Sequence, residues 1–463
     1  MLREKLPVVS FQHVRISAVL EIKFTADELV LALLRVSESE PVYILDSCGV
    51  GHLGSHLLIA GLRPVEVFEV TSDDSDRTLE LLDENLSKGL AAIFTLSYDL
   101  GIKLPPSVTT THRADLAEPD LFLALFDSLL VHDYDSGRTF FVGNNEARFF
   151  EIVDLIRKHE AEAASMDAAP EKAGPVVSNF TRTEYVAAVG YIQELIRSGD
   201  TYQTNLTQQL RCNVAPGATA ESVYWRLRRD HPAPFSAFLR RPSSTVVSAS
   251  PERFFRTTRK GGIESSPIKG TRRRGVNVED DLRLRAELLA SAKDRAENTM
   301  IVDLVRNDLG RVCKYGSVAV KTLCEIEEHP TLFHLVSTVQ GNLRNGVGFS
   351  EILRAVFPCG SITGAPKVRT MQIIDEIEDC ARGLSMGAIG IYLPENWEFT
   401  GLELDSIFDL SVAIRTMVFR DGEAVFNVGG GVVIDSEPEK EFGESLLKAH
   451  ALLTAIGTSY PDA

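Results

Sequence analysis

The chain has 463 residues, of which 44% are hydrophobic, so it can bury one large core or two to three ordinary ones. Acidic residues outnumber basic residues by 65 to 48, for a net charge of -17, which disfavours nucleic acid or an anionic membrane as a partner. Because no apolar run reaches a membrane span and the six cysteines show neither a CxxC motif nor metal-ligand spacing with histidine, we expect a cytoplasmic protein without a zinc site.

The sequence divides into two regions joined by a connector. Short β-rich runs, VYIL (42–45), AAIFTLSY (91–98) and FLALFDSLLVHDY (122–134), alternate with turn signals in the first third, as in antiparallel sheet. A later stretch is rich in Ala, Glu and Pro without strand alternation, and is typical of a charged connector. We expect an N-terminal domain, a connector and a larger C-terminal domain with the bounds 1–156, 157–177 and 178–463.

A glycine motif near the start resembles a dinucleotide-binding loop. GVGHLG, at 49–54, matches the GxGxxG pattern after an apolar strand. The helix that would follow is stopped by Pro64, and no second βαβ unit appears. We therefore favour a plain turn, and keep a catalytically silent dinucleotide-binding protein as an alternative.

Helices and strands alternate in the C-terminal region. EYVAAVGYIQELIRSG (184–199) has helical apolar spacing and ends at a glycine, and strands are predicted in QTNLTQQLRCNV (203–214) and STVVSAS (244–250). Two further helices are predicted, one long helix from about Asp280 to Leu309 and another from Pro438 to Ile456. The pattern favours an α+β architecture with large sheets.

Two of these helices carry pairs of carboxylates. Asp294 and Glu297 are three residues apart, as are Glu441 and Glu444, so each pair shares a helix face. Lys448 lies four residues beyond Glu444 on the same face. Such a surface offers oxygen ligands to a hard cation and an ammonium to an anion. Taken alone, however, a charged helix face is more often simply solvated.

The segment before the last helix is NVGGGVVIDSEPEKE. Its three glycines, Gly429, Gly430 and Gly431, can bring bare backbone N–H groups close to a ligand. Ser436 followed by Glu439 predicts a capped helix start. The whole stretch NVGGGVVIDSEPEKEFGESLLKA resembles the C-terminal signature of the chorismate-binding enzymes.

This resemblance extends along nearly the whole chain. From residue 178 onward, family-like segments occur in family order, among them SNFTRTEYVAAVGYIQELIRSGDTYQTNLTQQ, SASPERFF, PIKGTRRRG, AENTMIVDLVRNDLGRV, HLVSTVQG and FPCGSITGAPKVRTMQIIDEIE. ILDS (44–47) and SYDLG (97–101) resemble the N-terminal domain of the family more loosely. The resemblance implies large antiparallel sheets in a β-sandwich-like core with helices packed outside.

The family binds chorismate, a dicarboxylate, with the help of Mg²⁺. By resemblance, Glu297 and Glu444 would be the main ligands of Mg²⁺ at the ring carboxylate, with Glu441 and Asp294 nearby. The residues implied to bind the substrate, chiefly its enolpyruvyl carboxylate, are Thr271, Tyr392, Arg415, Gly429, Gly430, Gly431 and Lys448.

Two further residues are implied in catalysis. His334 would assist departure of the C4 hydroxyl by donating a proton, although a lone histidine among apolar residues is more often a core residue. Thr363, in GSITGAPK, precedes a proline-started helix that should point its N-terminus at the pocket. Capping is the competing explanation for Thr363.

The sister reactions of the family differ at two positions. Members that add water carry a lysine base where this chain has Gln203, and an amide cannot act as that base. Lys269 in PIKGT resembles the members that make 4-amino-4-deoxychorismate, where an amine attacks C2, expels the C4 hydroxyl and is displaced by ammonia at C4. The arginines of TRRR (271–274) and a bound cation would favour the neutral amine. Conversion of chorismate to anthranilate and pyruvate is the alternative.

No GxCxG nucleophile loop of a glutaminase is found in the sequence. We therefore expect ammonia from a separate glutamine amidotransferase subunit, in a heterodimer. A further enzyme would then convert the product to p-aminobenzoate for folate synthesis.

Overall fold

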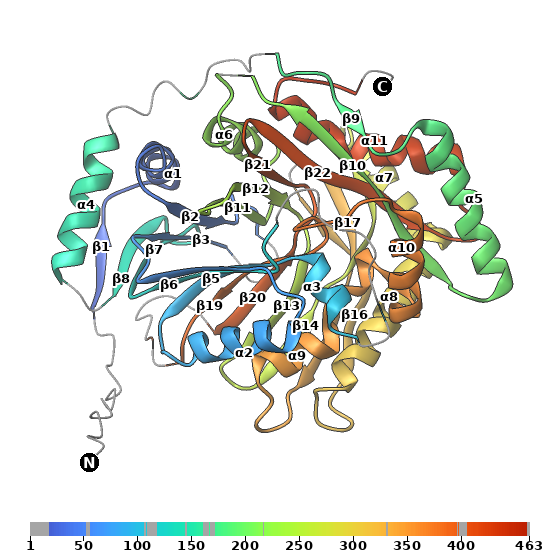
Figure 1. Cartoon of the computed structure of the whole chain (residues 1–463), viewed down its shortest axis with the longest axis horizontal. Helices are drawn as coiled ribbons and strands as arrows, with labels where there is room; N and C mark the ends of the chain where they lie inside the picture. Colours follow the sequence, from blue (N-terminus) through green and yellow to red (C-terminus); the bar gives the residue numbers. More distant parts are fainter. Residues whose placement is uncertain are drawn as a thin grey trace, which may run out of the picture.

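Two large antiparallel sheets form the centre of the protein (Figure 1). The computed structural model describes residues 18–51, 56–105, 108, 118–143, 146–160, 166, 172–215, 217–329, 332–395, 397 and 405–460. One sheet has 12 strands and the other has 10.

The 12-stranded sheet contains most strands of the N-terminal region together with β22, the strand that carries Gly429–Gly431. Its order is β1 (Ala18–Ile22), β8 (Arg138–Gly143), β7 (Ser128–Asp133), β3 (Leu57–Leu62), β2 (Val42–Asp46), β11 (Phe235–Arg240), β12 (Thr245–Ser250), β21 (Thr416–Arg420), β22 (Glu423–Val432), β10 (Gln203–Asn213) and β18 (Gly364–Ala365), with β9 (Val177–Ser178) beside β10.

The 10-stranded sheet carries the strand that contains Lys269. Its order is β15 (Ile268–Arg273), β17 (Leu332–Asn342), β14 (Gly262–Ser265), β13 (Arg253–Thr258), β20 (Ser406–Val412), β19 (Ala388–Tyr392), β5 (Ala91–Leu96), β6 (Leu121–Phe126) and β4 (Glu66–Val70), with β16 (Ala319–Glu328) beside β17.

Helices cover the outside of both sheets (Figure 1). They are α1 (Ala26–Val36), α2 (Ser75–Leu86), α3 (Tyr98–Lys103), α4 (Glu146–Glu160), α5 (Arg182–Ser198), α6 (Ala220–Asp230), α7 (Val278–Ala290), α8 (Ala292–Gly310), α9 (Phe349–Val356), α10 (Lys367–Ile377) and α11 (Pro438–Ala455), with a short 3₁₀ turn at Gly360–Ile362. Each amphipathic helix buries its apolar side on a sheet, which is what drives the layering.

Three apolar clusters define the layers. One joins the facing sides of the two sheets, with Tyr43 of β2 packed against Phe122 of β6. A second lies between the 12-stranded sheet and α1, α4, α6 and α11, and a third between the 10-stranded sheet and α2, α8, α9 and α10. The expected α+β fold, with sheets stacked as a sandwich and helices outside, is confirmed.

Both sheets contain strands from both halves of the sequence. In the 12-stranded sheet β2 pairs with β11, and in the 10-stranded sheet β5 pairs with β19. The helix α4 runs to Glu160, beyond the predicted start of the connector. The connector at 157–177 therefore separates two regions of the sequence, but each sheet contains strands from both regions.

Three local predictions differ from the structure. The single helix expected over 280–309 is broken at Ser291, whose hydroxyl caps α8 by accepting from the Asp294 amide. Ser436 does not cap α11; its hydroxyl donates to Glu441 Oε1 at 2.7 Å. The helix considered after GVGHLG is the strand β3 instead, and part of that motif, 52–54, lies outside the described residues.

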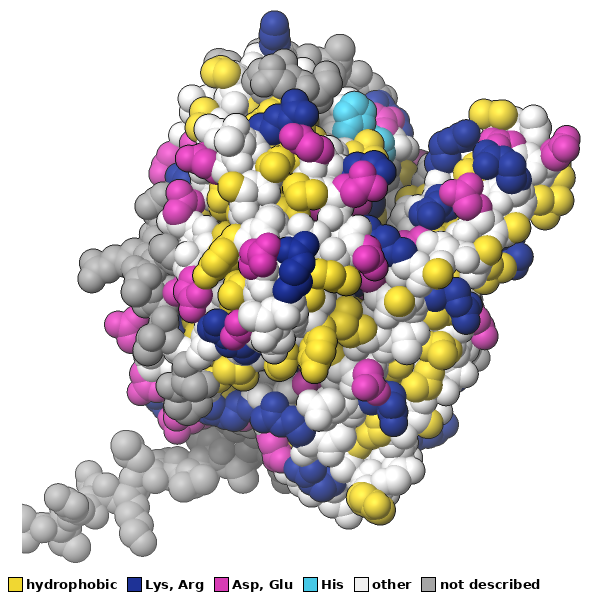
Figure 2. All heavy atoms as spheres, turned by 90° about the vertical axis from the view of Figure 1, so that its right-hand side faces the viewer, with side chains coloured by type: hydrophobic (Ala, Val, Ile, Leu, Met, Phe, Trp, Pro, Cys, Tyr) yellow, Lys and Arg dark blue, Asp and Glu magenta, His cyan; other side chains and the backbone are white. Residues whose placement is uncertain are grey.

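The surface agrees with the expectation from charge. Figure 2 faces the side of the molecule on the right in Figure 1, and there Lys and Arg side chains are interspersed with Asp and Glu. On this face there is no continuous basic patch of the kind that binds nucleic acid. Within the described ranges, no helix is both long and apolar enough to cross a membrane.

Candidate active site

Lys269 lies among acidic groups at the edge of the 10-stranded sheet. Its ammonium donates to the Ser361 carbonyl at 3.1 Å, in the turn that precedes Thr363. Its positive charge acts on the carboxylates of Glu252 and Glu297. The chain can bend here because Gly270, with φ +87°, interrupts the pairing of β15 with β17.

Glu252 is a site residue that the sequence analysis missed. It is only 5% exposed, and its Oε1 has no hydrogen-bond partner within the described structure. Burial raises the pKa of this carboxyl, although Lys269, the Ser361 hydroxyl and the Ile268 amide act in the opposite direction. A buried carboxyl with a free oxygen and a raised pKa is suited to donate a proton to a bound substrate.

Two of the predicted metal ligands converge on one point. Glu297 of α8 and Glu441 of α11 both approach the Lys293 ammonium, at 3.9 and 3.7 Å. Burial raises the pKa of Glu297; Lys269 and Lys293 oppose this shift, while the charges of Asp294 and Glu441 add to it. A positive charge between Glu297 and Glu441 therefore stabilises their ionised forms.

Glu444 faces the same region from the next turn of α11. Its carboxylate forms an ion pair with Lys448 at 2.8 Å. Burial would raise the pKa of Glu444, but the Lys448 and Lys293 ammonium groups outweigh it and lower the pKa. A Cβ at Gly430 would lie 3.4 Å from Glu441 Oε2 and 3.7 Å from Glu444 Oε1, so both oxygens lie against the glycine strand.

These residues fit a hard cation in their chemistry. Their oxygens come from two helices, and Lys293 already occupies a position where a cation neutralises two of them. Over the described residues, no three His, Cys, Asp or Glu side chains are arranged to hold a metal ion. Asp294 forms an ion pair with Arg272 at 3.1 Å.

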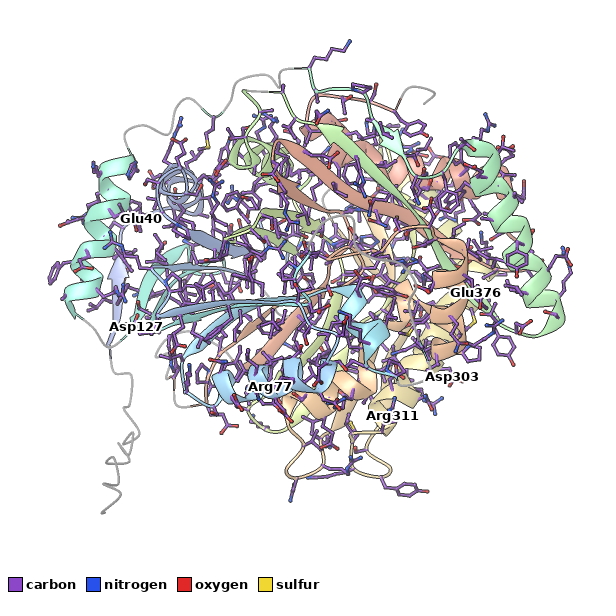
Figure 3. All side chains as sticks on the ribbon, viewed as in Figure 1. Glu40, Arg77, Asp127, Asp303, Arg311 and Glu376 are labelled. Atoms are coloured by element: carbon purple, nitrogen blue, oxygen red, sulfur yellow. The ribbon has the colours of Figure 1, made fainter. Side chains whose placement is uncertain are left out.

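Exposure separates Glu297 from acids at the periphery of the molecule. Asp303 on α8 and Glu376 on α10 lie at the periphery in Figure 3, with side chains 74% and 52% exposed. Glu297, also on α8, is 14% exposed. The helix therefore has a solvated acidic side and an inner acid that faces the site.

The glycine strand leaves room for the neighbouring groups. A Cβ at Gly431 would stand 2.5 Å from Gln203 Nε2, and one at Gly429 would stand 1.9 Å from the Leu206 carbonyl. Gln203 is fully buried, and neither atom of its amide group has a partner within the described structure. Such an unsatisfied amide is costly unless a ligand completes its hydrogen bonds.

Two cations near this strand are suited to an anion. Lys448 donates to the Gly429 carbonyl at 3.0 Å. Arg415 follows β20 with φ +49°, burial lowers the pKa of its guanidinium, and it forms no ion pair with any described residue. A partly buried, unpaired arginine is a strong candidate for binding a carboxylate.

His334 and Thr363 are both held by hydrogen bonds. His334 Nδ1 lies 2.9 Å from the hydroxyl of Thr271, its neighbour across the β15–β17 pair. Thr363 is fully buried, and its hydroxyl donates to the Cys359 carbonyl at 3.0 Å. Thr363 therefore stabilises the turn beside Lys269. Helix α10 begins after Pro366 without a side-chain cap.

Tyr392 is not brought to this group. On β19 its ring stands on the same side as Ala388 and packs against Phe408, with ring centroids 4.8 Å apart. Phe408 in turn stacks on Phe349 of α9. Strand alternation thus turns Tyr392 toward the apolar cluster under α9, and its binding of the substrate stays a prediction.

The three arginines after Lys269 are also placed differently from the expectation. Each forms ion pairs with acids on α7 or α8, so their charges are largely neutralised: Arg272 with Glu287 and Asp294, Arg273 with Asp280, and Arg274 with Asp281.

Comparison with known proteins gives a consistent family. The model of the family described as chorismate binding enzyme matches residues 40–454. Aminodeoxychorismate synthase component 1 of Bacillus subtilis is 38% identical over 378 residues, covering 80% of this chain and 77% of the relative. Anthranilate synthase component 1 of Aquifex aeolicus is 36% identical over 390 residues, covering 81% and 76%.

Other relatives are longer, and a solved structure shows the same fold. Aminodeoxychorismate synthase of Streptomyces pristinaespiralis is 40% identical over 366 residues, which are 76% of this chain but 49% of the relative. The chain thus spans about half the length of that protein. The crystal structure of anthranilate synthase component I from Streptococcus pneumoniae superposes with a TM-score of 0.72 at 24% identity, covering 87% of this chain and 93% of that chain.

Proposed function

This chain belongs to the chorismate-binding enzyme family, and from that premise we propose that it aminates chorismate to 4-amino-4-deoxychorismate. The observation that carries the proposal is Lys269, a primary amine placed between Glu252 and Glu297 and beside the Ser361 carbonyl. Relatives named aminodeoxychorismate synthase component 1 support it.

The first step uses Lys269 as a nucleophile and Glu252 as an acid. The neutral amine attacks C2 of chorismate, the ring double bonds shift, and the C4–oxygen bond breaks. The departing hydroxyl takes a proton from the Glu252 carboxyl and leaves as water, and the new ammonium at the Lys269 nitrogen gives its extra proton to the resulting Glu252 carboxylate. His334, held by Thr271, is the second proton donor available to this hydroxyl.

The second step releases the enzyme. Ammonia attacks C4, the bond between C2 and the Lys269 nitrogen breaks, and the proton lost by ammonia returns to the lysine nitrogen. Gln203 is neutral, so it can donate or accept a hydrogen bond without activating water. The product keeps its enolpyruvyl group.

Two adjoining sets of residues would bind the two carboxylates of the substrate. Arg415, Lys448 and the backbone of Gly429–Gly431 would bind the enolpyruvyl carboxylate. Glu297, Glu441 and Glu444 would hold Mg²⁺, which neutralises the ring carboxylate when it is bound. We place this reaction in the cytoplasm, on the route to p-aminobenzoate and folate, with ammonia from a separate glutamine amidotransferase subunit.

The test of the function is product identity. The purified chain is incubated with chorismate, Mg²⁺ and ammonium at alkaline pH, with and without an added aminodeoxychorismate lyase. We expect p-aminobenzoate only when the lyase is present, and no anthranilate. Anthranilate and pyruvate formed without the lyase would identify the second candidate, which the Aquifex aeolicus relative supports by its name.

Removal of the metal should abolish turnover. We expect chelation by EDTA to lower chorismate consumption by about 100-fold or more, because three carboxylates then face the ring carboxylate without a neutralising cation. Added Mg²⁺ should restore the rate. Glu297→Gln should raise the Mg²⁺ concentration needed for half-maximal rate, whereas Asp303→Asn, on the solvated side of the same helix, should not. An EDTA-resistant rate would contradict the metal proposal.

A further inference from the structure

A buried ion pair lies directly behind the candidate site. Arg382 and Glu378 are 3% and 2% exposed. The guanidinium donates two hydrogen bonds to the carboxylate, from Nη2 to Oε1 at 2.7 Å and from Nε to Oε2 at 2.8 Å. A buried ion pair contributes little more to the stability of the fold than apolar packing would. We therefore expect this pair to have a role other than stabilising the fold.

Arg382 also holds two segments of the site through their backbone. Its Nη1 donates to the Ile362 carbonyl at 3.0 Å, and its Nη2 donates to the Asn205 carbonyl at 2.7 Å. Ile362 lies between Ser361, which accepts from Lys269, and Thr363. Asn205 is two residues from Gln203 on β10. One guanidinium therefore fixes the turn beside Lys269 relative to the strand of Gln203.

Glu378 completes this attachment. Its Oε1 accepts from the Thr207 amide at 2.7 Å and from the Thr207 hydroxyl at 3.0 Å, again on β10. The amide of Asn205 donates to the Thr363 carbonyl at 2.8 Å, so the strand and the turn also contact each other directly. A shift of the ion pair would move both segments together.

The pair is also contacted by helix α3 of the N-terminal region. The Tyr98 ring lies 4.5 Å from the Arg382 guanidinium, a cation–π contact at the start of α3. The neighbouring loop is fixed at Gly383, whose amide donates to Asp99 Oδ2 at 2.9 Å and whose carbonyl accepts from the Tyr98 amide at 2.8 Å. The N-terminal region thus supports the far side of the site.

We propose that Glu378 and Arg382 are positioning residues of the chorismate site, which hold Gln203 and the Ser361–Thr363 turn at the separation that the substrate requires. This inference rests on the proposed function for its substrate. A planar fork is required because one side chain must satisfy a carboxylate and two carbonyls at once, which an ammonium on a flexible chain cannot do.

Arg382→Lys tests the proposal, because it keeps the charge and loses the fork. The matched control is Arg228→Lys, at a second buried pair in which Arg228 Nε lies 2.8 Å from Asp46 Oδ2. The Arg228 guanidinium also donates to Asp27 and to the Tyr134 hydroxyl, both in the N-terminal region. For each variant we measure thermal unfolding, KM for chorismate and kcat from chorismate consumption. Amide hydrogen exchange is measured over 202–206 and 360–365.

We expect Arg382→Lys to raise KM about tenfold and to lower kcat/KM by about 100-fold, because misplacing groups by about 1 Å has effects of this size. Exchange should increase in both segments. Arg228→Lys should lower the melting temperature to a similar degree, with KM and exchange in these segments unchanged. KM within about twofold of the wild type for Arg382→Lys, in a folded protein, would overturn the proposal.

A milder variant covers the case in which Arg382→Lys fails to fold. Thr207→Val removes only the hydroxyl that donates to Glu378, and should raise KM and exchange in the same direction by a smaller amount. An unchanged KM and unchanged exchange in this variant would overturn the proposal. If the wild-type chain consumes no chorismate, the proposed function fails, and the exchange experiment still decides whether the pair positions these two segments.

Discussion

Replacing Lys269 with alanine is expected to abolish formation of 4-amino-4-deoxychorismate, with a fall in its rate of about three orders of magnitude. Without the amine no covalent bond forms at C2, so there is no lysine adduct that ammonia can attack at C4. C2 is then open to ammonia itself, so any remaining turnover should place nitrogen at C2. The measurement is product mass and p-aminobenzoate formation with added lyase.

The control must separate the charge of Lys269 from its nucleophilicity. Lys269→Arg keeps a cation near Glu252 and Glu297 but provides no amine that can attack at neutral pH. We expect it to bind chorismate and to be as inactive as the alanine variant. Intact-protein mass spectrometry should show an adduct of chorismate less one water in the wild type only. A variant that still forms the product at a wild-type rate would rule out covalent catalysis by this residue.

The structure also constrains how the amine becomes neutral. The arginines expected to assist deprotonation are paired with acids of α7 and α8, and the charge of Lys269 acts on Glu252, Glu297 and Glu444. Because Glu252 is the acid required for the C4 hydroxyl, a proton passing from Lys269 to Glu252 would prepare both groups at once.

The elements were largely predictable from local pattern. The alternation in VYIL and the helical spacing that ends at Gly199 reappear as β2 and α5. The long helix over 280–309 was predicted as one element because its apolar stripe continues, while the break depends on a single serine cap at Ser291. Hydrophobic periodicity carries no information about such a cap.

The site was predictable where residue chemistry dominates and less so where side-chain direction matters. Glu297, Glu441 and Lys269 were identified by type and by family resemblance, and the structure brings them close together. The side on which the Tyr392 ring stands could not be predicted, because one position along a strand reverses that side, and the ring packs against Phe408. The segment SASPERFF resembles the family as a whole, which does not single out its glutamate. Only the burial of Glu252 and its carboxylate oxygen without a hydrogen-bond partner in the described structure distinguish it from an ordinary acid.

Glu252→Gln should lower kcat for chorismate consumption by about 100- to 10,000-fold, the range expected when a general acid is removed. The amide keeps the size and polarity of the side chain but cannot give a proton to the C4 hydroxyl. Because burial raises the pKa of Glu252, the protonated form persists to higher pH than for an exposed glutamate. The wild-type kcat should therefore fall as pH rises through this raised pKa, and the variant should lose that limb.

The matched control for Glu252 is Glu264→Gln on the neighbouring strand β14. Glu264 is also buried, at 8% exposed, but its carboxylate is occupied by Arg256 at 3.2 Å. Removing this charge deprives the partly buried Arg256 of this ion pair and should destabilise the fold without changing kcat of the folded enzyme. Equal effects of the two substitutions on kcat would mean that kcat depends on buried charge in this sheet and does not depend on proton donation by Glu252. A normal pH limb in Glu252→Gln would assign the acid to His334, whose Nδ1 lies 2.9 Å from the Thr271 hydroxyl.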